Sequence, residues 1–244
     1  MEFPQNSHFV ALNNSYDLVG NKTWDNDEFT SESIGKSRAL FTEDSLLSRK
    51  PVPRELEVYA LLSGIEFDRE MVSKLSNLQR EISSILENSL HYWVRPANLG
   101  VEYCVLKWPD DSWNNNWMEP TSKVLDSTLP EIPSFLFSIY GLQINPDGCI
   151  IAKGYDENAT FPAIRRALKS RLDFLPERQS SWAHIPMGRI LEPVGSEKFE
   201  KLRSFIEKIK DEFIVSSKIY SIKFVHETQW YMEKKTLLSE LFLK

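Results

Sequence analysis

Two apolar runs joined by a short polar turn place the strongest constraint on how this chain of 244 residues can fold. Residues 135–144 and 149–153 are rich in aromatic and β-branched side chains, and the turn Asn145-Pro146-Asp147-Gly148 separates them. A proline and a glycine at these places fit a type I turn followed by a left-handed residue, which is a common connection in β-hairpins. The spacing therefore predicts an antiparallel hairpin.

A strand, a helix and a second strand are predicted before this hairpin. Residues 56–62 and 101–108 have the length and side-chain composition of strands. Between them, Asp68 can cap a helix whose apolar residues recur at steps of three and four positions. These apolar residues are Met71, Leu75, Leu78, Ile82, Ile85 and Leu86. Residues 109–133 predict a long, partly packed loop with a short helix.

The chain after the hairpin repeats this alternation. Two further helices are predicted, the first capped by Thr160 and the second by Ser196. Strands are predicted at 183–191, 219–229 and 236–243. The basic residues of the first helix, such as Arg165, are most simply explained as a solvated face. Strands and helices that alternate around a hairpin indicate an α+β protein.

The N-terminal residues have a different composition from the rest of the chain. Residues 1–51 are rich in Asn, Ser, Asp and Glu and contain only short apolar groups, which predicts an extended polar arm that packs in places. The segment Pro51-Val52-Pro53 then stiffens the chain. We therefore expect an N-terminal arm over residues 1–51 and a folded domain over residues 52–244.

Composition argues against several classes of function. The formal net charge of -6 disfavours a basic surface that binds duplex DNA. No apolar run is long enough to cross a bilayer, and the two cysteines, Cys104 and Cys149, indicate reduced thiols, so we expect a cytoplasmic protein with no membrane partner. The cysteines and histidines lack metal-binding spacings, and no glycine-rich phosphate loop is present, so neither a metal nor a cofactor is predicted.

The segment Trp182-Ala183-His184-Ile185-Pro186-Met187-Gly188-Arg189-Ile190 resembles the second signature of the two-histidine phosphoesterase superfamily, which includes RNA 2',5'-ligase-like proteins and cyclic nucleotide phosphodiesterases. Residues 94–99 resemble the lead-in to the first signature of that family. The resemblance spans residues 52–244. It implies two pseudo-symmetric lobes, each an antiparallel sheet backed by helices, around a central cleft that binds a nucleotide or an RNA-terminal phosphodiester.

This chain departs from the family pattern at the motif positions. The family has two His-x-Thr or His-x-Ser motifs on facing strands. In the second motif His184 is retained, and Pro186 occupies the hydroxyl position. In the first motif, the two positions hold either Gly100 and Glu102 or, with a shift of two residues, Glu102 and Cys104. The first histidine is therefore absent in both alignments.

The resemblance makes His184 the retained general acid or base. Two imidazoles of differing protonation can carry out acid–base chemistry near neutral pH, and only one remains here. Glu102 is a candidate for the missing partner, because a carboxyl group in apolar surroundings has a raised pKa. The alternative is that Glu102 forms a structural ion pair with a neighbouring Lys or Arg.

Further residues are candidates for ligand contacts, together with Pro186 at its motif position. His226 and Thr228 repeat the His-x-Thr spelling on one face of a predicted strand, although later in the chain than the second signature requires. With Gln229 they make this strand unusually polar, which either a ligand site or a structural hydrogen-bond network explains. Trp108 can stack on a nucleobase or serve in ordinary packing.

Two functions remain open from the sequence. The first is binding of a nucleotide or RNA end, with hydrolysis of 2',3'-cyclic phosphates if His184 and Glu102 are catalytic. The second is a catalytically inactive module on the same fold, which binds a ligand or an unknown protein partner. Loss of one member of an acid–base pair costs about 10²–10⁴-fold in rate, and this favours the second function.

Overall fold

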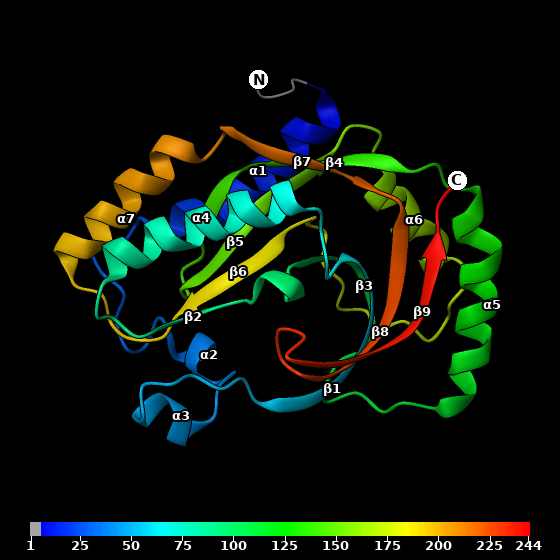
Figure 1. The fold of residues 1–244 in the computed structure, drawn as a ribbon, viewed down its shortest axis with the longest axis horizontal. Helices are drawn as coiled ribbons and strands as arrows, with labels where there is room; N and C mark the ends of the chain where they lie inside the picture. The colour runs from blue at the N-terminus through cyan, green and yellow to red at the C-terminus, as the bar shows by residue number, and fades with distance from the viewer. Residues whose placement is uncertain (1–5) are drawn as a thin grey trace.

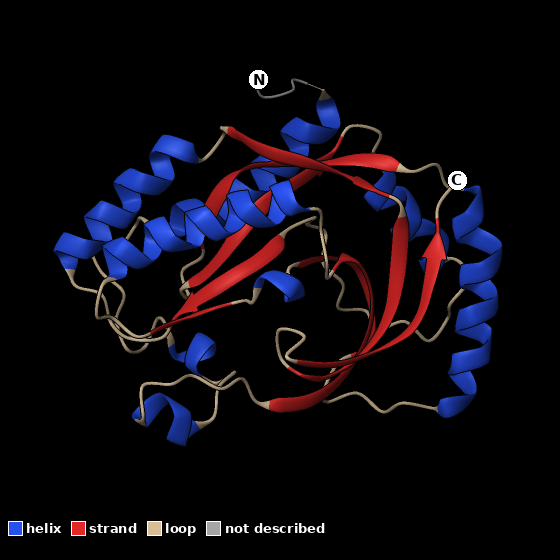
Figure 2. Ribbon diagram, viewed as in Figure 1, coloured by secondary structure: helices blue, strands red, loops and turns tan. Residues whose placement is uncertain are grey.

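The hairpin predicted from the sequence lies in the larger of two antiparallel sheets (Figures 1 and 2). In the computed structural model, which describes residues 6–244, β4 (Phe135–Ile144) pairs with β5 (Cys149–Asp156) in antiparallel orientation. Gly148 in the connecting turn has a φ of 77°, so it supplies the left-handed residue that the turn requires. The hairpin prediction is confirmed.

Three more strands complete this sheet, whose order is β2-β6-β5-β4-β7. They are β2 (His91–Trp93), β6 (Ile185–Ile190) and β7 (Phe213–Ile219). Figure 1 shows α4 (Arg69–Leu86) and α7 (Ser196–Ile209) lying together over one face of the sheet. Asp68 caps α4 by accepting a hydrogen bond from the Met71 amide at 2.9 Å, as the sequence predicts.

The second sheet has four strands in the order β3-β1-β8-β9. They are β1 (Glu55–Gly64), β3 (Gly100–Lys107), β8 (Ser221–Gln229) and β9 (Lys234–Phe242). Figures 1 and 2 show this sheet curling into an open half-barrel, with α5 (Met118–Thr128) and α6 (Thr160–Lys169) on its outer side. Since β1 pairs with β8, strands from both ends of the domain share one sheet.

One hydrophobic core connects the two sheets with the helices that flank them. It contains Met71 of α4, Phe161 of α6, Phe199 of α7, Phe137 of β4 and Phe224 of β8, all of which are buried. Burial of this apolar surface is the main favourable contribution to folding. The predicted α+β architecture, with two antiparallel sheets backed by helices, is confirmed.

The N-terminal residues form helices, so the prediction of an extended arm is wrong. The helices are α1 (Ser7–Gly20), α2 (Gly35–Arg38) and α3 (Glu43–Leu47). α1 packs on β4 and β5 on the face opposite α4 and α7, where Phe9 stacks on Tyr155 with ring centroids 5.1 Å apart. The Tyr16 hydroxyl also hydrogen-bonds the Gly154 carbonyl and the Ala183 amide. Phe9 and Tyr16 lie seven residues apart and therefore share one helix face, a spacing that the intervening Asn and Ser residues obscured.

Other elements also differ from the sequence prediction. The short strand β2 was not predicted, and neither was β7, which ends at Ile219, where the predicted strand begins. The helix expected within residues 109–133 is α5, which has 11 residues. The carboxylate of Asp156 accepts hydrogen bonds from the amides of Thr160 and Phe161, so Asp156 caps α6 in place of Thr160. Ser196 is the first residue of α7 and not its cap.

Both cysteines are buried free thiols, as their apolar strand positions predict. Burial raises the pKa of Cys104 to about 12 and that of Cys149 to about 11, so neither thiol forms an appreciable thiolate at neutral pH. Within residues 6–244, none of the helices combines the length and the apolar character needed to traverse a bilayer.

Candidate functional site

The two strands that contain the motif positions, β3 and β6, lie against each other where the two sheets meet. Arg165 of α6 connects β3 to the residues that lead into β6. Its Nε donates a hydrogen bond to the Tyr103 carbonyl at 2.8 Å, and its Nη2 donates to the carbonyls of Glu102 at 2.9 Å and Trp182 at 2.6 Å. The expectation that Arg165 is solvated is therefore wrong, because three carbonyl groups hold its half-buried guanidinium between the sheets.

The carboxyl group of Glu102 lies half-buried beside this guanidinium. Burial raises its pKa to about 7, even though the positive charges of Arg165 and Arg178 lower it. Within the part of the chain that the structure describes, the Glu102 side chain forms no ion pair, so a direct structural pair does not account for it. Near neutral pH this group can therefore give up or take up a proton.

The imidazole of His184, the residue directly before β6, is half-buried. It meets the Trp182 ring edge-on, with centroids 5.8 Å apart, and its buried Nδ1 has no hydrogen-bond partner among residues 6–244. Burial, together with the positive charges of Arg165 and Arg189, lowers its pKa to about 4. His184 is therefore uncharged at neutral pH.

An irregularity in β6 places Arg189 on the same face of the sheet as the motif positions. Pro186 pairs with Ile151, whereas Gly188 pairs with Ile150, so β6 contains one extra residue at this point. Pro186 and Arg189 therefore lie on one face. Arg189 donates hydrogen bonds to Asp147 Oδ2 at 2.7 Å and, from Nε, to the Tyr231 hydroxyl at 2.7 Å.

The tip of the β8–β9 hairpin reaches toward this region from the half-barrel (Figure 1). Glu227 of β8 is buried, and its Oε1 accepts a hydrogen bond from the Met232 amide at 2.8 Å. Burial raises the pKa of Glu227 to about 7, and the negative charge of Glu102 contributes to the increase. Glu102 pairs with Leu62 and Glu227 pairs with Val58, so the two carboxyl groups lie on the same side of the sheet.

The register of the half-barrel separates His226 and Thr228 from Glu102. Glu102 pairs with Leu62 and His226 pairs with Tyr59, so their side chains project from opposite faces of the sheet. The His226 ring stacks on Tyr59 at 4.4 Å between centroids, and its Nε2 lies 3.1 Å from the Glu57 carboxylate. The Thr228 hydroxyl donates to the Lys234 carbonyl at 3.4 Å. The structure thus does not bring either residue to His184.

Gln229 is buried and has a structural partner. Its side-chain amide donates a hydrogen bond to the Pro53 carbonyl at 2.7 Å, which ties the end of β8 to the segment before β1. A structural hydrogen-bond network thus accounts for the polar character of this strand.

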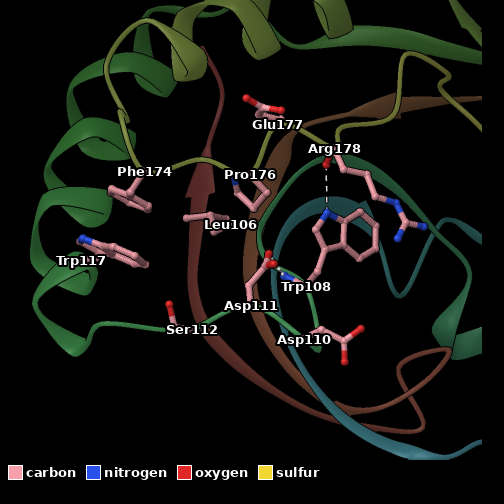
Figure 3. Close-up of a pocket in the computed structure, with 10 residues that line it drawn as sticks. All are labelled: Leu106, Trp108, Asp110, Asp111, Ser112, Trp117, Phe174, Pro176, Glu177 and Arg178. Atoms are coloured by element: carbon pink, nitrogen blue, oxygen red, sulfur yellow. Dashed lines mark hydrogen bonds between the residues drawn. The ribbon is translucent and has the colours of Figure 1, made fainter.

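Trp108 lines a pocket of about 580 Å³ beyond the end of β3 (Figure 3). Its Nε1 donates to the Arg178 carbonyl at 2.9 Å, and the Arg178 guanidinium lies over the indole ring at 4.5 Å from the centroid. Trp117 and Phe174 stack on each other in the same pocket, with centroids 4.7 Å apart. His184 and Glu102 do not line this pocket.

Sequence comparison finds no relatives, since no protein-family model and no curated protein matches this chain. Solved structures do match. TT0787 of Thermus thermophilus is 14% identical with a TM-score of 0.55, covering 77% of this chain and 97% of that one. Escherichia coli LigT in its apo form is 11% identical with a TM-score of 0.55, covering 78% and 99%. ATU0111 from Agrobacterium tumefaciens is 15% identical with a TM-score of 0.56, covering 76% and 86%. The chain has the fold of LigT and of a solved phosphoesterase.

In this LigT-like fold, the contact of β3 with β6 brings the two segments with the motif positions together. These segments carry one imidazole and one carboxyl group, at His184 and Glu102, with Arg165 between their backbones. Within residues 6–244 no hydrogen bond links the two side chains. The positive charge of Arg165 lowers the pKa of both. In the same part of the chain, no three His, Cys, Asp or Glu side chains are placed to hold a metal ion.

Sequence reasoning missed Arg165 and Glu227 as members of this group. Arg165 follows Ile164 on a helix whose basic residues are otherwise exposed, so only its three carbonyl partners distinguish it from Arg166. Glu227 lies in the same polar run of the sequence as His226. Strand alternation places the two on opposite faces, and burial of the carboxyl group follows only from the sheet register.

Proposed function

We propose that this chain binds a nucleotide or an RNA-terminal phosphodiester beside Arg165, between Glu102 and His184. The observation that carries this proposal is the position of Arg165, whose guanidinium links β3 to the segment that leads into β6 and whose charge acts on both side chains. Three carbonyl groups hold the guanidinium in place, and its Nη1 makes no hydrogen bond to any residue of 6–244. A guanidinium fixed in this way offers rigid donors to phosphate oxygens.

Two further arginines add positive potential to the same region. Arg178 lowers the pKa of Glu102, and Arg189 lowers that of His184, so both act across the space between the strands. Structures of Escherichia coli LigT complexed with ATP and with 3'-AMP match this chain with TM-scores of 0.51 and 0.52. These complexes support a nucleotide as the class of ligand.

The protonation state of His184 and the side chains at the other motif positions favour binding of a phosphodiester over its cleavage. With a pKa of about 4, His184 is a neutral imidazole at neutral pH, so it is not the imidazolium acid that protonates a leaving oxygen, and it is a weak base. Neither candidate for the position of the first histidine, Gly100 or Glu102, is a histidine, and Pro186 offers no hydroxyl donor. The groups that remain can hold a phosphodiester more readily than they can cleave it.

One observation favours a second function, which is hydrolysis of a 2',3'-cyclic phosphate. The pKa of Glu102 is about 7, the value at which a general acid or base is most effective at neutral pH. In this candidate, protonated Glu102 donates its proton to the leaving ribose oxygen, while neutral His184 accepts a proton from the attacking water.

Calorimetric titration with 2',3'-cyclic AMP tests the binding proposal. We expect the wild-type protein to bind this phosphodiester and Arg165→Lys to bind it about tenfold more weakly, because an ammonium cannot reproduce the planar array of donors. Arg166→Lys is the matched control, since Arg166 is the next residue on α6 and is exposed. Equal affinities for Arg165→Lys and the wild type, with unchanged circular dichroism, would contradict the proposal.

Turnover of the same cyclic nucleotide separates the two functions. For a binding protein, we expect no hydrolysis by the wild type above that of buffer. If the second function is correct, the wild type hydrolyses the substrate, and both His184→Ala and Glu102→Gln lose about 10²–10⁴-fold in rate. Wild-type turnover that survives both substitutions would exclude these residues as the acid and base.

A further inference from the structure

The pocket beyond the end of β3 shares only Arg178 with the region of the proposed phosphate site. It lies at the edge of the half-barrel, with Leu106 at its base, and is enclosed by the loop that follows β3 and by residues 174–178 (Figure 3). Its volume of about 580 Å³ is within the range of small-molecule sites. The chemistry of its lining therefore indicates what kind of molecule it can hold.

Aromatic rings line the pocket on two sides. Trp117 and Phe174 stack in parallel, with an interplanar angle of 3°, and form one side. Trp108 lies across from them in Figure 3. The Arg178 guanidinium covers one face of the Trp108 ring, so a ligand can contact only the opposite face of this indole.

The charged residues of the lining are mostly acidic. Asp110, Asp111 and Glu177 contribute three carboxylates, and Arg178 is the single basic residue. All four are exposed, and within residues 6–244 none of the three carboxylates forms an ion pair. The net charge of the lining is therefore -2 at neutral pH, with Arg178 included.

We propose that this pocket binds a small organic cation with a compact alkylammonium group. Aromatic rings attract such a group through their negative faces, and carboxylates at the rim complement its charge. The same lining repels phosphate. A neutral base would gain stacking energy from the rings but nothing from the carboxylates. This inference does not depend on the proposed phosphate site.

Calorimetry with choline and with 3,3-dimethyl-1-butanol tests the proposal, because the two molecules have nearly the same shape and differ in charge. We expect choline to bind in the millimolar range and at least about fivefold more tightly than the neutral alcohol. Binding should weaken with added sodium chloride. Equal affinity for the two molecules, or no heat of binding with choline in that range, would overturn the proposal.

A pair of double variants locates the site. Asp110→Asn with Glu177→Gln removes two charges from the pocket and should weaken choline binding about fivefold. Asp126→Asn with Glu131→Gln removes two charges from exposed residues outside the pocket and should leave it unchanged. An equal loss of choline affinity in both double variants would mean that choline binding depends only on the net charge of the protein, which would contradict the proposal. Adenosine that binds more tightly than choline would assign the rings to a nucleobase instead.

Discussion

At the scale of single residues, burial shifts the two motif-strand groups in opposite senses. Transfer from water disfavours the charged form of any group, so it raises the pKa of the Glu102 carboxyl group and lowers that of the His184 imidazole. The nearby arginines oppose the first shift and reinforce the second. His184 therefore stays neutral and Glu102 titrates near pH 7, so the pKa of the glutamate lies above that of the histidine, the reverse of the usual order.

These shifts predict how stability depends on pH. The folded pKa of Glu102 is raised above the unfolded value of 4.5, so the folded state binds more protons between pH 4.5 and 7 and loses stability as pH rises through that range. Glu102→Gln should therefore raise the free energy of unfolding at pH 8 by up to roughly 3 kcal/mol and change it little at pH 4.5.

Chemical denaturation at the two pH values measures this difference. Glu28→Gln is the control, because Glu28 is exposed in the N-terminal segment and its loss should have the same small effect at both values. A stability gain for Glu102→Gln that is equal at pH 4.5 and pH 8 would show that ionisation of Glu102 is not its cause.

A second residue-scale prediction concerns Gly154 of β5, next to the point where α1 reaches the sheet. A Cβ atom on this residue would lie 2.0 Å from the Ala183 carbonyl oxygen and 2.2 Å from the Phe137 ring. Gly154→Ala should therefore destabilise the protein by about 3 kcal/mol or more, measured by thermal unfolding. Gly195→Ala is the matched control, since no atom lies within 4 Å of its added Cβ. A melting temperature that is the same in both variants would contradict this packing argument.

At the scale of elements, the β8–β9 hairpin holds an unfavourable turn. Tyr231 and Met232 have φ angles of 63° and 57°, a conformation that costs a side chain other than glycine about 1–3 kcal/mol. The contacts around the turn offset this cost. Arg189 donates a hydrogen bond to the Tyr231 hydroxyl, and Glu227 accepts one from the Met232 amide. The Met232 side chain packs on a cluster of buried apolar residues, which are Leu62, Ile65 and Val225.

Removal of one of these contacts should weaken the turn. Tyr231→Phe leaves the buried Arg189 Nε without its hydrogen-bond partner, and we expect a loss of about 1.5–3 kcal/mol in the free energy of unfolding. Tyr220→Phe, at an exposed tyrosine, should cost little by comparison. Urea denaturation of the two variants measures both effects, and a loss for Tyr231→Phe no larger than that for Tyr220→Phe would show that the bond to Arg189 does not stabilise the hairpin.

Most helices and strands follow from local patterns, whereas the N-terminal helix and the site do not. The Asp68 cap and the apolar spacing behind it predict α4, and the turn ending at Gly148 predicts the hairpin of β4 and β5. In α1, polar residues separate Phe9 from Tyr16, so the sequence does not show that these two side chains form the buried face of the helix. Their packing on the sheet shows it. The role of Arg165 could not be predicted, because its partners are backbone carbonyls of strands distant in sequence.

At the scale of the whole molecule, one core joins the N-terminal segment to both sheets. Phe29 and Ile34, which precede β1, are buried in the same cluster as Phe137 of the larger sheet and Phe224 of the half-barrel. The sequence predicted two lobes and a separate arm. The strand patterns indicated an α+β protein and the resemblance implied the antiparallel lobes, but the attachment of the arm depends on contacts that no local pattern specifies.

This shared core predicts that the chain unfolds as one cooperative unit. Denaturation curves followed by far-ultraviolet circular dichroism and by tryptophan fluorescence should have the same midpoint. Trp24, near Phe199 of α7, reports on the N-terminal segment, and a Trp24→Phe variant shows how much of the fluorescence change comes from it. Separate midpoints, with an early change that depends on Trp24, would show that the N-terminal segment unfolds on its own.

The pairing of β1 with β8 has a consequence for the time at which the protein folds. β1 ends at Gly64 and β8 begins at Ser221, so a ribosome must synthesise most of the chain before β1 meets its partner. At ordinary rates of translation this interval is on the order of ten seconds. During it, the apolar strands β1 and β3 lack half of their sheet, and long-range pairing of this kind is intrinsically slow. The nascent chain therefore depends on protection from aggregation until its last residues are made.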